Sequence, residues 1–265
     1  MKFKNICFAT VALGIYCTSA TLTSASVAYL RSEDGGAPWG LTGNEEQMDN
    51  VFGAGNWSDL RFETVSPAAL FSSGTSFVFL EGGDAGAEEL QTFLTANSAT
   101  IGSWVSAGGR LLVNSAPNEG GLTDLGFGVT LTYSDFSFSG SAVNAAHPVF
   151  NGPAVPVSIA FTGDYLSHAS VSGAGLSGII VDDNGDMILA EKSVGSGHVV
   201  FGGLTLPFFT SHPLWLPQPE ASNLHQNIIA YSANPVPEPS TYLAGALLLV
   251  IFGVHRLRSS PRQAA

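Results

Sequence analysis

Apolar and polar positions follow two patterns along the first half of the chain: short apolar runs, and longer segments with one apolar face. Short apolar runs predict four strands, over 26–31, 60–65, 76–80 and 110–114. Segments with one apolar face predict helices over 45–52 and 84–107, the first capped by Asn44 and the second by Asp84. Strands that alternate with helices predict a parallel sheet with helices on both faces.

The pattern changes after the fourth strand, where short β-rich pieces alternate with Gly, Ser and Asn. Apolar runs over 178–181 and 187–191 flank the segment 182–186, whose Asn-Gly pair favours a tight hairpin turn. A further strand over 197–201 and an amphipathic helix over 221–231 complete the domain. We therefore expect an α/β fold with a mostly parallel sheet and β-rich additions in its second half.

Both ends of the chain carry targeting patterns. Residues 1–25 have a basic start, an apolar stretch and small residues, which predicts a secretory signal peptide removed by signal peptidase after Ala20 or Ala25. An uncharged run over 242–254 predicts a C-terminal hydrophobic helix, although a full membrane span needs roughly 20 residues. The arginines beyond that run favour the cytoplasmic side, which places the main domain outside the inner membrane.

A proline-rich segment precedes the hydrophobic run, and a basic tail follows it. The segment consists of Val236, Pro237, Glu238, Pro239, Ser240 and Thr241, and the tail carries Arg256 and Arg258. This three-part order over 234–262 resembles a PEP-CTERM sorting signal, which exosortase handles in Gram-negative bacteria that make exopolysaccharide. The resemblance implies transient anchoring in the inner membrane, processing near the prolines, and delivery to the cell surface or extracellular matrix.

Composition restricts what the remaining domain, 26–233, can do. Both cysteines, Cys7 and Cys17, fall in the signal segment, so the domain has no disulfide and no cysteine nucleophile. Four Lys and Arg stand against 20 Asp and Glu, a formal charge of −16. This charge excludes nucleic acid as a partner and suits calcium, neutral glycans or simple solubility.

Three segments of the domain resemble the class I glutamine amidotransferase-like superfamily, especially its trehalose-utilisation-type members. They are the strand-to-helix connection at 81–84, the segment 104–113 and the segment 147–152. The resemblance implies a flavodoxin-like three-layer sandwich. The superfamily places a catalytic cysteine on a strand-to-helix elbow, and the equivalent positions here, 114–116, read Asn-Ser-Ala. Glutaminase chemistry is therefore not expected.

Candidate ligand-binding residues follow the predicted strands, because a doubly wound sheet binds ligands at the carboxyl ends of its strands. The expected crevice comprises Glu33, Asp34, Trp39, Glu81, Asp84, Asn114, Ser115 and His147. Oxygen ligands suit Ca²⁺, and an exposed Trp can stack on a sugar ring. In the alternative interpretation Asp84 only caps a helix, Ser115 closes a strand, and the others are solvated turn residues.

Three functional hypotheses follow. The first is a non-catalytic surface protein of the exopolysaccharide or biofilm matrix that binds extracellular polysaccharide or Ca²⁺, with no cofactor required. The second is a secreted hydrolase that cleaves carbohydrate or amide bonds with Glu81, Asp84 or Glu119. The third is a structural protein without any site. No catalytic residue and no firm metal site is assigned.

Overall fold

The computed structural model describes residues 26–34, 36–118, 122–211 and 218–234. The predicted signal peptide, residues 235–262 of the predicted sorting signal, and Glu119 lie outside these ranges. Within them, no helix is both long and apolar enough to cross a membrane.

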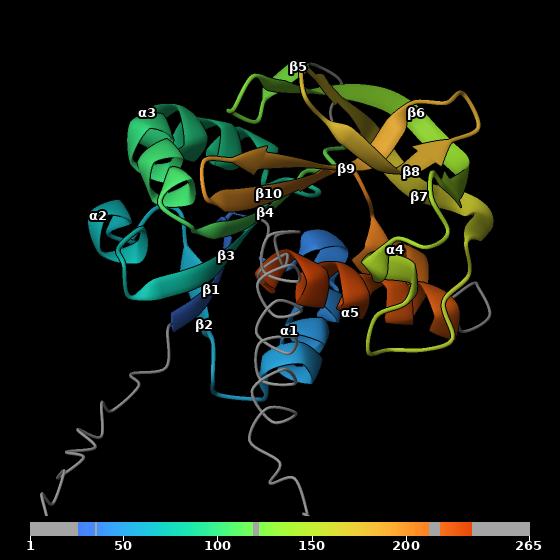
Figure 1. Ribbon diagram of the computed structural model, residues 1–265, viewed down its shortest axis with the longest axis horizontal. Coiled ribbons are helices and arrows are strands. Elements are labelled where there is room, and N and C mark those ends of the chain that lie inside the picture. The colour runs from blue at the N-terminus through green and yellow to red at the C-terminus, as the bar shows by residue number, and fades with distance from the viewer. Residues whose placement is uncertain (1–25, 35, 119–121, 212–217, 235–265) are drawn as a thin grey trace, which may run out of the picture.

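One ten-stranded sheet organises the described part of the chain (Figure 1). Its strands are β1 (Ser26–Arg31), β2 (Ser58–Arg61), β3 (Thr75–Glu81), β4 (Arg110–Asn114), β5 (Leu122–Asp124), β6 (Val129–Ala142), β7 (Ala160–Gly173), β8 (Ser177–Asp182), β9 (Met187–Val194) and β10 (Gly197–Gly202). Their order is β2-β1-β3-β4-β10-β9-β8-β6-β5, and β7 pairs with β6. Neighbours from β2 to β10 run parallel, and the remaining pairs are antiparallel. The expectation of a mostly parallel sheet therefore holds for the first half only.

Helices cover both faces of the parallel half. The longer helices are α1 (Gly43–Phe52), α2 (Pro67–Leu70), α3 (Ala87–Ser106), α4 (Leu206–Ser211) and α5 (Pro219–Ala233), with short 3-10 turns η1 (Pro38–Gly40) and η2 (Pro148–Phe150). Successive side chains of a strand point to opposite faces. In β4, Leu111 and Val113 join the core under α2 and α3, whereas Leu112 joins the core under α1, α4 and α5.

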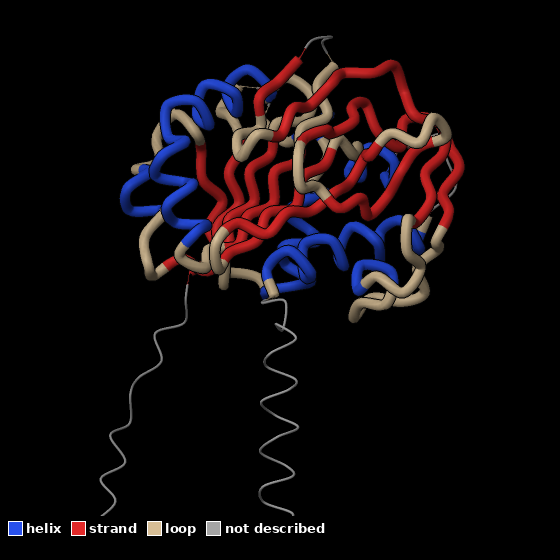
Figure 2. Tube along the Cα trace, turned by 45° about the horizontal axis from the view of Figure 1, so that its top comes forward, coloured by secondary structure: helices blue, strands red, loops and turns tan. Residues whose placement is uncertain are grey.

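The antiparallel half returns to the ends of the parallel strands. Figure 2 shows the strands running through the middle of the fold with helices on either side. The two 14-residue strands β6 and β7 form the longest pairing of the antiparallel half. The segment that follows β10 then bonds to β7, since His168 N donates to Gly203 O at 3.0 Å and Thr205 N donates to Leu166 O at 3.1 Å. This closure brings β7 beside the carboxyl ends of the parallel strands.

The helices predicted within the described residues exist, but the caps predicted for the first two are wrong. The N-cap of α1 is Thr42 and that of α3 is Gly86, and neither cap makes a side-chain hydrogen bond. Asn44 instead bonds to Tyr29 and Glu81 inside the core, and Asp84 bonds to residues of two other loops. Both side chains are used in contacts between elements rather than at the helix ends. The β8–β9 hairpin forms as expected, and β1 and β4 have the predicted bounds.

Candidate functional site

Aromatic and polar side chains from five separate segments meet at the carboxyl edge of β3, β4 and β10. We call this group the strand-end aromatic site, and it consists of Trp39, Asp84, Asn118, Tyr165, His168 and Phe208. Trp39 belongs to η1, Asp84 follows β3, Asn118 follows β4, and the other three come from β7 and α4. The sequence predicted only the first two of them.

Asp84 connects the loops of the site. Its Oδ2 accepts a hydrogen bond from Trp39 N at 2.9 Å, and its Oδ1 accepts one from Asn118 Nδ2. Its own backbone N donates to Ala116 O at 3.0 Å, which ties the turn after β3 to the segment after β4. The Asp84 carboxylate is thus fully engaged in holding the loops together.

Trp39 packs edge to face on His168 and at a tilt on Phe208. Its ring centroid lies 5.9 Å from that of His168, at 78°, and 5.9 Å from that of Phe208. Tyr165 contacts Phe208 at 5.6 Å and 86°. Trp39, Tyr165 and Phe208 remain partly exposed. His168 is buried; burial lowers its pKa, and its Nδ1 lies 3.2 Å from Pro117 O.

Three of the site residues have left-handed backbone conformations. Among the described non-glycine residues, positive φ occurs at Trp39 (55°), Asp84 (55°), Phe127 (56°) and Tyr165 (66°). A side chain in this region costs on the order of 1–3 kcal/mol, and such residues cluster at functional sites. Only one of the four, Phe127, lies outside the strand-end aromatic site. The strain is therefore concentrated where the rings are presented.

Glu81 lies directly beneath this site and is only 2% exposed. Its Oε1 accepts from Gly83 N at 2.6 Å, and its Oε2 accepts from Asn44 Nδ2 at 2.8 Å. Asn44 Nδ2 also lies 3.0 Å from the Tyr29 hydroxyl oxygen. Burial raises the pKa of Glu81 to about 7, against the opposing effect of its hydrogen-bond donors. Its ionisation therefore falls in the neutral range.

Asp34 of the expected crevice lines a small pocket with Glu81 and Asp84 beside η1, but the remaining predicted residues do not face Trp39. Glu33 and Asp34 are exposed, and the backbone N of Glu33 bonds to Glu63. Asn114 bonds through both side-chain atoms to the backbone of Leu204. Ser115 is fully buried, and its hydroxyl donates to Gly82 O at 2.9 Å, so it offers no accessible nucleophile.

His147 lies at the opposite, amino edge of the parallel strands, in a second polar cluster. Glu191 of β9 places Oε1 3.6 Å from His147 Nε2 and Oε2 3.2 Å from His198 Nε2. The Tyr231 hydroxyl donates to Glu191 Oε2 at 2.6 Å. Because Val149 N donates to His147 Nδ1, the proton of a neutral His147 ring sits on Nε2, which leaves no lone pair there for a metal.

No set of three or more His, Cys, Asp or Glu side chains is arranged for a metal ion within the described ranges. The acidic turn between β8 and β9 is a hydrogen-bonded hairpin. Its Asp182 Oδ1 accepts from the backbone N of Asn184 and of Asp186, each at 2.9 Å. Calcium binding therefore stays a prediction for which the described side chains form no ligand cluster.

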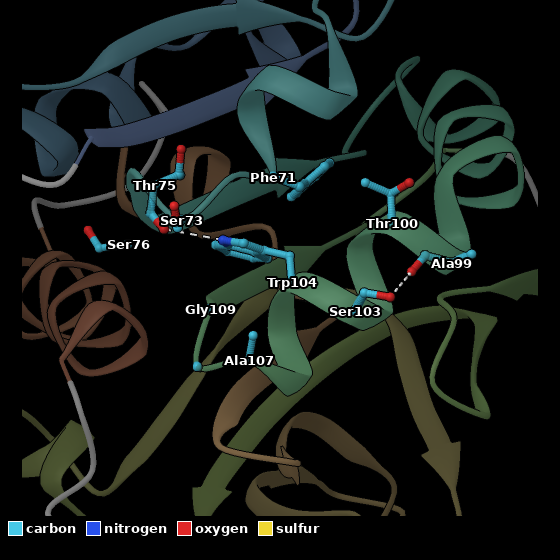
Figure 3. A pocket seen from close by; sticks show the side chains of 11 residues that line it. Phe71, Ser73, Thr75, Ser76, Ala99, Thr100, Ser103, Trp104, Ala107 and Gly109 are labelled. Atoms are coloured by element: carbon cyan, nitrogen blue, oxygen red, sulfur yellow. Dashed lines mark hydrogen bonds between the residues drawn. The ribbon is translucent and has the colours of Figure 1, made fainter.

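An open groove of about 800 Å³ runs along the C-terminal half of α3 (Figure 3). Phe71 and Trp104 form its floor, but each is only 7% exposed and offers no free stacking face. Trp104 Nε1 donates to Thr75 O, and Ser103 Oγ donates to Ala99 O, so these donors are satisfied internally. We assign the groove no ligand.

Comparisons with known proteins identify structural neighbours only. No protein-family model and no curated protein sequence matches this chain. Among solved structures, the cytoplasmic protein STM3548 from Salmonella typhimurium is 15% identical with a TM-score of 0.48, over 78% of this chain and 98% of that one. A ThuA-like protein from Bacteroides uniformis is 9% identical with a TM-score of 0.43, over 83% and 95%.

A similar match is to a β-galactosidase from Rahnella sp. R3, which is 13% identical with a TM-score of 0.45. It covers 81% of this chain but only 33% of the β-galactosidase. The chain therefore corresponds to about a third of that enzyme.

Proposed function

We propose that this protein is a non-catalytic, exported surface protein that binds a neutral glycan through the strand-end aromatic site. One observation carries the proposal. Two partly exposed aromatic residues of the site, Trp39 and Tyr165, have left-handed backbone conformations, and so does Asp84, which bonds to Trp39. A fold keeps such strain where function requires a particular side-chain position.

The chemistry of the site suits a sugar better than an ion. Trp39 and Tyr165 are partly exposed, and Trp and Tyr side chains combine an apolar ring with a polar group at low entropic cost. The exposed amide of Asn118 adds hydrogen-bonding capacity at the rim. The formal charge of −16 over 26–233 repels polyanions, which favours a neutral polymer.

The hydrolase alternative names Glu81, Asp84 and Glu119, of which the structure describes the first two. Glu81 is buried with both oxygens accepting hydrogen bonds, and both oxygens of Asp84 accept as well. Glycoside hydrolysis needs two carboxyl groups that flank the scissile bond. We therefore base the proposal on binding.

Export and sorting form the second part of the proposal. We infer that signal peptidase removes residues within 1–25 and that exosortase acts near Pro237, Glu238 and Pro239 in a Gram-negative cell. The hydrophobic helix then anchors the chain in the inner membrane only in transit, and the product joins the cell surface or matrix. Replacing those three residues by alanine should leave the unprocessed chain in the membrane fraction. Unchanged processing and location of the alanine variant would refute the sorting proposal.

We also propose that the domain is a class I glutamine amidotransferase-like, flavodoxin-like three-layer α/β sandwich without the superfamily's cysteine. The alternation of strand and helix through β4 supports this assignment, as does Asn-Ser-Ala at 114–116 in place of a cysteine elbow.

Retention on immobilised polysaccharide tests the binding proposal. The mature protein should be retained by at least one neutral polymer in a panel of gluco-, manno-, galacto- and N-acetylglucosamine polymers. It should pass through polygalacturonate, which carries one charge per residue. Retention by none of the neutral polymers contradicts glycan binding, and retention by polygalacturonate alone contradicts the choice of a neutral ligand.

A further inference from the structure

We propose that Glu81 is the positioning residue of the strand-end aromatic site, and that its ionised carboxylate holds the turn at 82–84 under Trp39 so that gaining a proton weakens ligand binding. This inference rests on the proposed function and adds a regulatory mechanism to the same site.

Gly83 connects the buried carboxylate to the exposed ring. A Cβ atom placed on Gly83 would lie 2.7 Å from Glu81 Oε1 and 3.2 Å from Trp39 Cη2. The backbone of this one residue therefore fills the space between the acid and the indole. Any shift of Gly83 away from Glu81 moves the surface against which Trp39 rests.

Asp84, the next residue, connects the turn to the other loops of the site. Asp84 follows Gly83 directly, has a φ of 55°, and accepts the Trp39 backbone N–H. Its backbone is tied to Ala116 and its side chain to Asn118. The turn that Glu81 holds therefore contacts Trp39 twice: Gly83 lies against the indole ring, and Asp84 accepts the backbone N–H.

The hydrogen bonds around Glu81 suit the ionised acid. The described groups that bond to it are donors: Gly83 N, Asn44 Nδ2 and the side-chain amide of Asn114. A proton on Oε1 would oppose the Gly83 N–H directly, and a proton on Oε2 would require the Asn44 amide to turn over. Hydrogen bonds to the charged form strengthen the hold on the turn, and protonation removes one of them.

Other titratable and charged groups face Glu81 from the elements packed against it. Tyr29 of β1 keeps its proton because burial raises its pKa further. On α1, Glu45 pairs with Arg31 of β1 at 2.9 Å. Asp84 and His168 lie in the site above. The variant Glu81→Gln removes the titration of Glu81 alone and leaves these groups in place.

Binding measured against pH provides the first test. The probe is the hexasaccharide of the neutral polymer that retains the protein most strongly, titrated by calorimetry into the full mature protein. The wild type should bind about tenfold more weakly at about pH 5.5 than at about pH 8, because the buried acid gains its proton in that interval. Glu81→Gln should bind with an affinity that changes less than about twofold over the same interval. A wild-type profile that is flat, or a Glu81→Gln profile with the same slope, overturns the inference.

Amide exchange at Gly83 provides a second test that needs no ligand. Protection of the Gly83 amide should fall as the pH drops through neutrality in the wild type and stay constant in Glu81→Gln, after correction for intrinsic exchange. Equal protection profiles overturn the inference even if the protein binds glycan. A pH-dependent Gly83 amide in a protein that binds no member of the panel refutes the proposed function and leaves the coupling between Glu81 and the turn intact.

Discussion

Trp39 donates its backbone N–H to the carboxylate of Asp84, 45 residues further along the chain, and both residues have a φ of 55°. Each residue holds the other in a conformation that an isolated peptide avoids. The hydrogen bond also joins the loop after β1 to the turn after β3, so the two loops act as one support for the indole.

Substitutions at Asp84 separate the strain from the hydrogen bonds. Asp84→Ala removes both acceptors and keeps the left-handed φ, so it should lower the free energy of unfolding by about 2 kcal/mol. Asparagine tolerates the left-handed conformation and retains an oxygen for Trp39 N, so Asp84→Asn should lower the free energy of unfolding by less than about 1 kcal/mol. Urea unfolding measures both variants. Equal losses for the two would contradict the role of the Trp39–Asp84 bond.

Glu81 should make the fold less stable as the pH rises. The folded protein keeps a proton on Glu81 up to about pH 7, whereas the unfolded chain releases it near its ordinary pKa of 4.5. Between these values the folded state binds more protons, so the free energy of unfolding falls with rising pH, by about 3 kcal/mol in all. Glu81→Gln should therefore gain stability relative to the wild type through this window and stay constant above it. A stability difference that does not change with pH would show that Glu81 is ionised throughout.

Glu191 should act in the opposite direction. Burial alone would raise the pKa of its carboxyl, but the facing imidazoles of His147 and His198 and the Tyr231 hydroxyl hold that pKa well below its ordinary value of 4.5. Its stabilising contribution is therefore complete above about pH 4.5 and is lost as the pH falls further. Tyr231→Phe removes one charge-assisted hydrogen bond and should cost about 1.5–3 kcal/mol at neutral pH. Acid-unfolding curves of Tyr231→Phe and Glu191→Gln test this, and midpoints equal to that of the wild type would refute it.

Two glycines offer a matched comparison of backbone packing. A Cβ on Gly197 would lie 1.9 Å from Val105 O and 2.5 Å from Gly109 O, both backbone atoms, so Gly197→Ala should cost more than about 3 kcal/mol. Gly102 lies inside α3 with nothing within 4 Å, so Gly102→Ala should stabilise by about 0.5–1 kcal/mol. Thermal unfolding measures both. A tolerated Gly197→Ala would contradict the close approach of β10 to the end of α3.

The strands of the parallel half could be predicted because their apolar runs are uninterrupted and end at turn residues. The 14-residue strands β6 and β7 were not predicted. Residues 129–138 of β6 alternate between apolar and polar apart from the pair 134–135, so the rule for half-buried strands would have indicated this strand. The sequence of β7 mixes Ser, Gly, Asp and His with its apolar residues, and its full length follows from pairing with β6.

The site was predicted in part, for a related reason. Trp39 and Asp84 follow strands whose ends the sequence located. Asparagine is a common N-cap residue, so the sequence favours a cap at Asn44, and only the fold shows that its partners are Tyr29 and Glu81. Phe208 was missed although it follows β10, the fifth parallel strand, and the rule applied to the other strand ends would have indicated it.

Tyr165 and His168 gave no such signal in the sequence. They reach the site only because β7 returns to pair with the segment after β10, a long-range contact that composition and periodicity do not encode. His147 was placed at the wrong edge for the same reason, because its loop is located by contacts with β9, β10 and α5.

The most direct test of glycan binding is the dissociation constant of the best neutral hexasaccharide for the wild type, Trp39→Ala and Trp57→Ala, measured by calorimetry at neutral pH. Trp57 is a suitable control because it is also partly exposed but packs on Tyr29 near β2, away from the strand-end aromatic site. Trp39→Ala should weaken binding at least about tenfold, since truncating a central contact Trp costs more than about 1.4 kcal/mol. Trp57→Ala should stay within about twofold of the wild type. Equal constants for the wild type and Trp39→Ala would contradict the account.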